Sequence, residues 1–175
     1  MYASSDDTFL LADCIRQYNG RRALEIGVGS GLLLNILEKN FAYVAGSDID
    51  LQALQHCKQQ KTSANVLLVC CDAGSAFGIG KFDLIVSNPP YLPNDNYYIR
   101  DPAVHGGPTG IETTVHFINS ALPLLAGDGK MLIVISSFAN SSALDKLVVE
   151  NKMHKKILKK KRLFYETLSI IELSL

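Results

Sequence analysis

The sequence has no apolar run long enough to cross a bilayer and no excess of charge of either sign. Its longest apolar stretches fall well short of the roughly 20 residues that a membrane helix needs. The amino terminus, MYASSDDTFLL, carries acids before its first apolar stretch and no cationic segment, so we expect no signal peptide. The 17 lysines and arginines balance the 17 aspartates and glutamates, giving zero net charge. A surface that wraps nucleic acid is therefore not expected.

The sequence also lacks cysteine pairs of the C-x-x-C type. Its four cysteines are Cys14, Cys57, Cys70 and Cys71, and we expect no metal site, zinc included, within this chain. Such unpaired cysteines suit a reducing compartment, which predicts a cytoplasmic or nuclear location. No repeat and no low-complexity linker is present. With 175 residues, 47% of them hydrophobic, the chain is expected to form a single domain, residues 1–175, around one core.

Apolar runs and helix-like patterns alternate along the chain. The predicted strands are Ala23–Ile26, Ala42–Ser47, Val66–Cys71, Phe82–Ser87, Met131–Ser136, Lys155–Arg162 and Thr167–Leu173. The predicted helices run from Ser4–Asp7 to Gly20, and over Leu32–Asn40, Leu51–Gln59, Ile111–Leu124 and Ala143–Asn151. Continuous apolar strands are typical of parallel sheets buried on both faces. The pattern predicts an α/β fold: a mostly parallel sheet with helices on both faces, closed by an antiparallel hairpin of the last two strands.

One connection in this pattern is unusually short. Only about ten residues, Asp72–Lys81, link the third and fourth strands. In a 3-2-1-4 strand order they must cross two strands and return along the sheet, which leaves no room for a full helix. We therefore expect part of one sheet face to be thinly covered.

A glycine-rich segment, Glu25-Ile26-Gly27-Val28-Gly29-Ser30-Gly31, follows the first predicted strand and opens a helix. Glycines here allow a tight turn and close approach of backbone to a ligand. A purely structural turn and a dinucleotide site are the alternatives. The dinucleotide fingerprint needs glycine where this sequence has Leu32. Glu25, two residues before Gly27, is instead typical of the methyltransferase loop that binds S-adenosylmethionine.

Acidic residues follow the next two strands. Asp48 ends the second strand, where a carboxylate accepts hydrogen bonds from ribose hydroxyls. Asp50 is expected to begin the following helix, since an acid suits a helix amino terminus. Asp72 ends the third strand, followed by Ala73, and either accepts from an adenine amino group or is a solvated turn residue. These positions, with the glycine loop, predict a nucleoside-containing cofactor.

The tetrapeptide Asn88-Pro89-Pro90-Tyr91 follows a buried strand and is the most informative motif. A planar amino or amide nitrogen carries two hydrogens, and two acceptors are needed to hold it. The Asn88 side-chain oxygen and the Pro89 carbonyl can supply them, because prolines lift this segment out of the strand ladder and hold it extended. Tyr91 is expected to pack on the flat substrate group or near the cofactor's sulfonium. A mere strand stop is the alternative.

These motifs together resemble the HemK-like glutamine N5-methyltransferases, which modify the GGQ loop of translation release factors, in their shorter eukaryotic and archaeal form. The resemblance also rests on Asp7–Leu11, on Gly106–Glu112 and on Glu166–Ser169. It implies a Rossmann-like class I methyltransferase fold with a seven-stranded sheet. It implies S-adenosylmethionine as cofactor, bordered by Thr8, Glu25, Gly27, Asp48, Asp72 and Asn88. Asn88–Tyr91 would hold the substrate glutamine amide.

The resemblance further implies a small zinc-binding activator subunit, forming a heterodimer. Val66–Cys71 would be an edge strand of this fold and is apolar on both faces, so we expect a partner to pair there. The residues leave other functions open: methylation of adenine N6 or guanine N2 in nucleic acid, protein lysine methylation, or a non-catalytic cofactor-binding subunit. The basic run Lys155–Arg162 is either a solvated strand face or a steering patch for an acidic surface or RNA.

Overall fold

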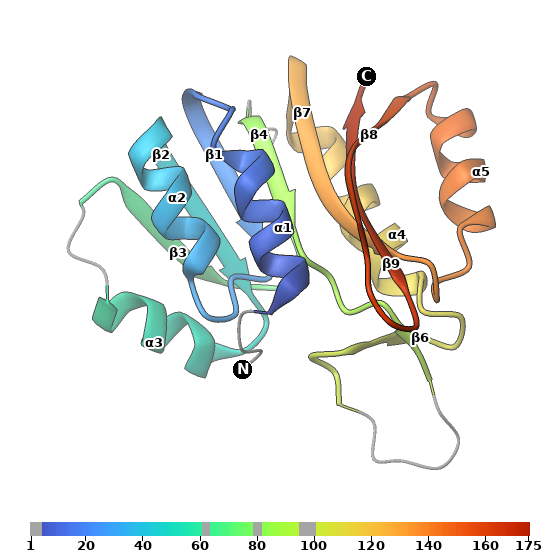
Figure 1. Ribbon diagram of the computed structural model, residues 1–175. Coiled ribbons are helices and arrows are strands. Elements are labelled where there is room, and N and C mark those ends of the chain that lie inside the picture. Colours follow the sequence, from blue (N-terminus) through green and yellow to red (C-terminus); the bar gives the residue numbers. More distant parts are fainter. Residues whose placement is uncertain (1–4, 61–63, 79–81, 95–100) are drawn as a thin grey trace.

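The computed structural model describes residues 5–60, 64–78, 82–94 and 101–175. Within these ranges, seven strands form one sheet in the order β3-β2-β1-β4-β7-β9-β8 (Figure 1). Their bounds are β1 Gly20–Ile26, β2 Phe41–Asp48, β3 Val66–Cys70, β4 Phe82–Ser87, β7 Leu125–Ser136, β8 His154–Arg162 and β9 Thr167–Ser174. The five strands from β3 to β7 in this order are parallel, and β9 pairs antiparallel with β7 and with β8. The predicted sheet and its closing hairpin are confirmed.

Helices cover both faces of the sheet. α1 Asp6–Ile15, α2 Leu32–Asn40 and α3 Leu51–Gln60 lie on one face, and α4 Glu112–Ala121 and α5 Ser142–Glu150 lie on the other (Figure 1). A short 3-10 helix, η1 Leu122–Leu124, continues α4. In β4, Leu84 and Val86 belong to the core under α1 and α2, whereas Ile85 belongs to the core under α4. This two-sided burial explains why the strand is apolar without alternation.

The start of the sheet differs from the sequence prediction. Gly20 was predicted to end the first helix, but α1 ends at Ile15 and Gly20 begins β1. The Asp83 carboxylate accepts hydrogen bonds from the backbone amides of Arg21 (2.6 Å) and Arg22 (2.9 Å), which extends the strand beyond its apolar part. A Cβ at Gly20 would lie 2.8 Å from Asp83 Oδ2, so the glycine permits close approach rather than a helix end. Ser4, the predicted helix start, lies outside the described residues.

The face of the sheet over β2 and β3 is thinly covered, as predicted. Leu67 pairs with Ala45, and Ala45 belongs to the core on the α4 side, so Leu67 and Tyr43 point to that face. Both are more than half exposed, at 59% and 57%. The described part of the short connection, up to Gly78, forms turns and contains no helix.

No strand or helix was predicted between Asn88 and Gly110, so this long segment after β4 was expected to be a loop. Its described part contains two short parallel strands, β5 Leu92–Pro93 and β6 His105–Gly107. They lie at the sheet edge where the parallel strands end (Figure 1). Residues 95–100 of the predicted loop lie outside the described residues. The folded segment forms one wall of the cavities at this edge.

Candidate active site

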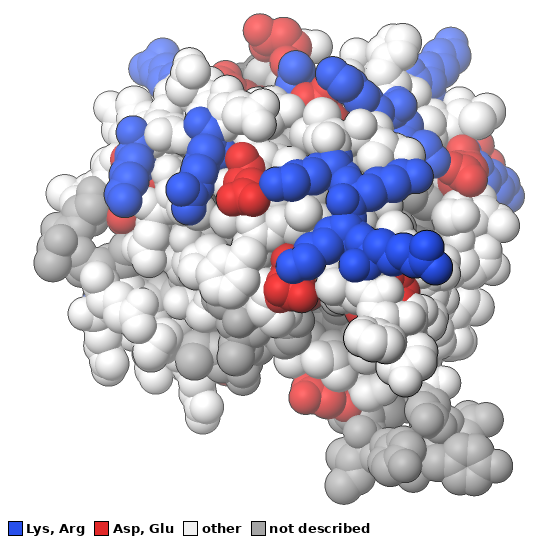
Figure 2. Space-filling model, in the orientation of Figure 1, with Lys and Arg blue, Asp and Glu red and all other residues white. Residues whose placement is uncertain are grey.

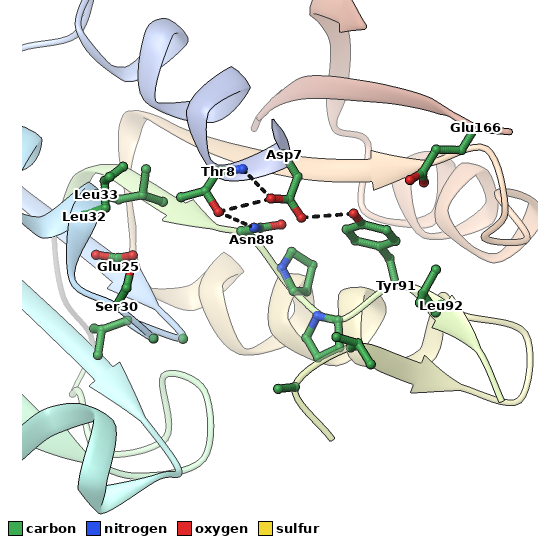
Figure 3. A pocket seen from close by; sticks show the side chains of 17 residues that line it. Asp7, Thr8, Glu25, Ser30, Leu32, Leu33, Asn88, Tyr91, Leu92 and Glu166 are labelled. Carbon is green, nitrogen blue, oxygen red and sulfur yellow. Dashed lines mark hydrogen bonds between the residues drawn. The ribbon is translucent and has the colours of Figure 1, made fainter. Parts of the chain in front are cut away.

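Two cavities that share lining residues lie at the carboxyl ends of β1 and β4. The larger, of about 630 Å³, is lined by residues that follow β1, β2 and β3 and by α4. The smaller, of about 150 Å³, is lined by the start of α1, the glycine loop, Asn88–Leu92 and Glu166 (Figure 3). Gly27, Gly29, Asn88, Pro90 and Ala103 line both. The arrangement offers one site for a large ligand and a second, narrower site beside it, with Asn88 between them.

The glycine loop forms the floor between β1 and α2. Gly27, Gly29 and Gly31 have φ angles of 79°, 48° and 78°, a region that glycine adopts without strain. Asp48 Oδ2 accepts a hydrogen bond from the Gly29 amide at 3.0 Å, which ties the loop to the end of β2. The sequence prediction that these glycines share one site with Asp48 agrees with the geometry.

Asp50 directly precedes α3, as expected for a residue that begins this helix. Asp50 Oδ1 accepts a hydrogen bond from the Gln52 amide (2.8 Å) at the start of α3. Asp48 lines the larger cavity, and its other oxygen, Oδ1, accepts from the Asp50 amide at 2.9 Å. A carboxylate has about four acceptor sites, so Asp48 keeps capacity for ligand hydroxyls. Its proposed contact with a ribose stays a prediction.

Asp72 and Ala73 also line the larger cavity. Ala73 is buried and has φ +46°, a strained conformation for a residue with a side chain. Such strain occurs where a ligand site constrains the backbone. Asp72 Oδ1 lies 2.8 Å from His116 Nε2 on α4. Sequence reasoning gave His116 no role, and no motif links it to Asp72, which lies 44 residues away.

The smaller cavity contains a hydrogen-bonded network that joins α1 to the Asn88–Tyr91 segment (Figure 3). Asp7, only 1% exposed, accepts a hydrogen bond from the Tyr91 hydroxyl at 2.9 Å and from the Thr8 hydroxyl at 3.1 Å. Thr8 Oγ1 in turn accepts from Asn88 Nδ2 at 3.1 Å. The resemblance placed Thr8 beside the cofactor but gave Asp7 no role. The structure shows that Asp7 is the centre of the network.

This network determines which way the Asn88 amide points. The Asp7 carboxylate only accepts, so the Thr8 hydroxyl donates to it and keeps its lone pairs for Asn88. Asn88 must then present its NH₂ group to Thr8. Asn88 Oδ1 is buried and has no hydrogen-bond partner among the described residues. A buried acceptor without a partner is costly, and Asn88 lines both cavities, where a bound group can supply the missing hydrogen.

Two glycines allow a second stretch of backbone to pack closely against the Asn88–Tyr91 segment. A Cβ at Gly106 would lie 2.3 Å from the Pro90 carbonyl oxygen, and one at Gly110 would lie 2.4 Å from the Tyr91 carbonyl oxygen. The two backbones therefore approach more closely than any side chain would permit.

Glu112 fastens the same turn. Its carboxylate accepts hydrogen bonds from the Thr109 amide and hydroxyl and from the Ile111 amide. Partial burial acts to raise the pKa of Glu112, but these hydrogen bonds outweigh it and hold the pKa below its ordinary value. The ionised form of Glu112 therefore stabilises the turn behind the motif.

Two further carboxylates line the smaller cavity. Glu25, 2% exposed, lies at its glycine-loop side, as the methyltransferase reading of the loop expects. Glu166, in the turn directly before β9, lies at the opposite side and accepts a hydrogen bond from the Ser136 hydroxyl at 2.6 Å. Sequence reasoning gave Glu166 no individual role, because only the fold brings the β8–β9 turn beside Tyr91.

The described residues contain no other kind of site by the following two criteria. In these ranges no group of three or more His, Cys, Asp or Glu side chains could hold a metal ion. No helix within them is long and apolar enough to cross a membrane. All four cysteines are free thiols.

Comparisons with known proteins show the family and the fold. Residues 5–165 match the family model described as the methyltransferase small domain. The chain is 31% identical, over 143 residues, to a putative protein N5-glutamine methyltransferase of Methanocaldococcus jannaschii, covering 78% of this chain and 73% of that protein. It is 27% identical to the release factor glutamine methyltransferase of Deinococcus radiodurans over 68% of this chain. The chain spans about half the length of that bacterial relative, 47%.

Among solved structures, one chain of the E. cuniculi Mtq2–Trm112 complex, which methylates the eRF1 translation termination factor, superposes with a TM-score of 0.81. The alignment covers 99% of this chain and 97% of that one at 23% identity, so it shows the shared fold. A Rossmann-like class I methyltransferase fold was expected from the sequence and is confirmed.

The fold and the family match define the class: an S-adenosylmethionine-dependent methyltransferase. The chain belongs to the methyltransferase small-domain family, and its relatives include protein N5-glutamine methyltransferases. The residues present fit the cofactor. The larger cavity has a volume in the range of ligand sites and combines an open glycine loop with the Asp48 and Asp72 carboxylates.

Proposed function

We propose that this protein transfers a methyl group from S-adenosylmethionine to the side-chain nitrogen of the glutamine in the GGQ motif of a class I translation release factor. One observation carries the chemical part: Asn88 lines the smaller cavity, its Oδ1 is buried without a partner, and its amide is oriented by Thr8. It is an acceptor placed for a planar NH₂ group. The named activities of the archaeal and bacterial relatives support the choice of a protein glutamine.

The cofactor would be held by the glycine loop, Asp48 and the turn at Asp72 and Ala73, and it supplies an electrophilic methyl group. The protein's own residues hold the acceptor. Asn88 Oδ1 accepts one hydrogen of the substrate amide and the Pro89 carbonyl accepts the other. Two such acceptors fix the nitrogen's orientation and raise its electron density, so positioning and electrostatics carry the catalysis.

Asp7 and Tyr91 complete the smaller cavity. The hydrogen bond to Asp7 fixes the Tyr91 ring at the wall of the cavity, where it can pack against the flat substrate amide. The attacking nitrogen becomes more acidic as it is alkylated, so its proton passes to water without a strong general base. A lysine ammonium would have to lose a proton first and gains little from two planar acceptors, which disfavours a lysine substrate.

The experiment is transfer of labelled methyl from S-adenosylmethionine to three acceptors: release factor, the same factor with its GGQ glutamine changed to alanine, and duplex DNA. We expect label on the first only, and its loss with Asn88→Ala. Label on DNA would favour the nucleic-acid amino methyltransferase alternative. Label on both release factor forms would place the methyl group on another residue and refute the glutamine assignment.

We further propose that the protein works as a heterodimer with a small zinc-binding subunit that pairs with the edge strand β3. The E. cuniculi structure, a two-protein complex, supports a partner. The two edges of the sheet differ in chemistry. β8 carries the lysine run, a device that blocks strand pairing, whereas β3 (VLLVC) carries no charge and leaves Leu67 59% exposed. β3 is therefore the edge open to strand addition.

Co-purification tests this proposal. Leu67→Lys on β3 is expected to abolish retention of the small subunit. The zinc content of the purified sample should fall with the loss of that subunit. Ile157→Lys, on β8 and also about half exposed (48%), is the matched control and should leave retention unchanged. Equal retention by both variants would show that the partner, if bound, does not use β3.

A further inference from the structure

The turn between β8 and β9, residues Leu163–Glu166, forms a pinned protrusion that we call the hairpin tip. The Leu163 amide donates to the Glu166 carbonyl at 2.8 Å, which closes the turn. Leu163 packs against the core, and Glu166 accepts from the Ser136 hydroxyl at the end of β7. Directly after the tip, the Thr167 amide donates to Ser137 Oγ at 2.9 Å. Both ends of the tip are therefore fastened to the sheet.

The two residues at its summit are aromatic and face solvent. Phe164 is 98% exposed and Tyr165 is 86% exposed, and their ring centroids lie 6.0 Å apart. Neither ring belongs to either core cluster. Turns usually carry glycine, asparagine or aspartate, and these two rings bury little area within the fold. Large rigid side chains that remain exposed in this way are typical of binding surfaces.

The hairpin tip is continuous with the proposed active site. Glu166, the next residue after Tyr165, lines the same cavity as Asn88 (Figure 3). On the other side of the turn, Lys161 forms a 3.0 Å ion pair with Asp6, the neighbour of the cavity residue Asp7. The tip is thus tied to the cavity rim through both of its strands. When the target side chain of a polypeptide enters the cavity, the neighbouring residues of that polypeptide must cross this rim.

The charges around the tip are basic on the β8 side. Lys155, Lys159 and Lys161 are paired with Asp145, Asp13 and Asp6 respectively. Lys160 and Arg162 are exposed, and Figure 2 shows Lys and Arg side chains gathered over the half of this face that carries β8 and β9. The surface next to the aromatic rings therefore complements acidic side chains.

We propose that the hairpin tip docks the protein substrate: Phe164 and Tyr165 pack against the substrate polypeptide next to the target glutamine, and Lys160 and Arg162 meet acidic side chains of that protein. This inference rests on the proposed function. It assigns part of the substrate recognition to a surface of the methyltransferase itself. Interfaces of this kind concentrate their binding energy in a few aromatic anchors flanked by polar groups.

Single-stranded RNA is the rival occupant, since bases also stack on aromatic rings beside basic residues. The charges at the cavity rim favour a protein over RNA as the occupant of the hairpin tip. Glu166 and Asp7 line the cavity, and carboxylates there would repel the phosphates of a nucleotide entering it. A neutral glutamine side chain on a polypeptide meets no such repulsion.

The test compares the double variant Phe164→Ala/Tyr165→Ala with wild type, in complex with the small subunit if activity requires it. Steady-state methylation of release factor is measured together with binding of S-adenosylmethionine. We expect the KM for release factor to rise about tenfold or more, with kcat and cofactor affinity unchanged. Val149→Ala on α5, also an exposed apolar residue (76%), is the control and should leave the KM unchanged. Melting temperature should not change, because neither ring packs in the core.

The outcomes separate this inference from the proposed function. Normal methylation of release factor by the double variant, with the KM within twofold of wild type, overturns the docking role. If wild type methylates a different protein, the proposed function fails, and the same comparison on that protein decides the docking role. Transfer to nucleic acid alone, or loss of single-stranded RNA binding with an unchanged protein KM, assigns the tip to RNA and overturns the inference.

Discussion

Replacing Thr8 by valine tests how the protein orients its catalytic amide. Thr8 is 6% exposed, and its hydroxyl bridges Asn88 Nδ2 and Asp7 Oδ1, each at 3.1 Å. Valine keeps the shape of the side chain but removes both hydrogen bonds. The Asn88 NH₂ group then has no acceptor on that side, at a cost of about 1–3 kcal/mol. A rotated amide, with its NH₂ group toward the substrate, becomes competitive and cannot accept the glutamine hydrogen.

A loss of this size corresponds to a fall in kcat/KM of about 5- to 150-fold. Thr8→Ser keeps the hydroxyl and is expected to remain within about threefold of wild type. The assay is methyl transfer to release factor, with cofactor affinity measured separately by calorimetry. If Thr8→Val weakens only cofactor binding and leaves kcat unchanged, Thr8 borders the cofactor without orienting Asn88, and the reasoning is wrong.

Three further predictions concern the walls of the two cavities. Gly106→Ala places a methyl group against the Pro90 carbonyl oxygen. This overpacking should lower the free energy of unfolding by about 1–3 kcal/mol, measured by thermal unfolding, and should also lower kcat. Gly127→Ala, where a Cβ would meet nothing within 4 Å, should have no such effect. Asp48→Asn should weaken binding of S-adenosylmethionine about tenfold or more in calorimetry, because a charged acceptor is lost; unchanged affinity would exclude Asp48 from the cofactor site. Since the pKa of Glu112 is lowered in the fold from its ordinary value of 4.5, its stabilising effect is present above that value and is lost as the pH falls through the folded pKa. Wild type should therefore melt higher than Glu112→Gln at pH 7, and this difference should shrink as the pH is lowered into the acid range; a difference of constant size at all pH values would contradict this.

The secondary structure was predictable where local signals agree. The helix Leu32–Asn40 and the strand Phe82–Ser87 were predicted to the residue. Gly31, left-handed at φ +78°, marks the start of the helix, and Asn88-Pro89 marks the end of the strand. β7 was predicted from Met131, but it begins at Leu125. Its first residues contain two glycines that resemble a turn, and only pairing of Leu125 with Phe82 of β4 extends the strand.

The individual motifs of the site could be predicted from the sequence, but the hydrogen bonds that join them could not. The glycine loop, Asp48, Asp72 and Asn88 were found because each follows a strand, and parallel strands end at one edge. The bond from Tyr91 to Asp7 joins residues 84 positions apart, and no local pattern encodes it. The Asp72–His116 contact depends likewise on how α4 packs. The assignment of these residues to cofactor binding, and the cytoplasmic or nuclear location, stay predictions.

The most direct measurement of the central claim is the mass of release factor after incubation with this protein, its partner and S-adenosylmethionine, followed by fragmentation of the GGQ peptide. A gain of one methyl group on the glutamine side chain, absent when Asn88→Ala replaces wild type, is the predicted result. A methyl group on any other residue, or full methylation by Asn88→Ala, would contradict the claim that Asn88 Oδ1 holds the accepting amide.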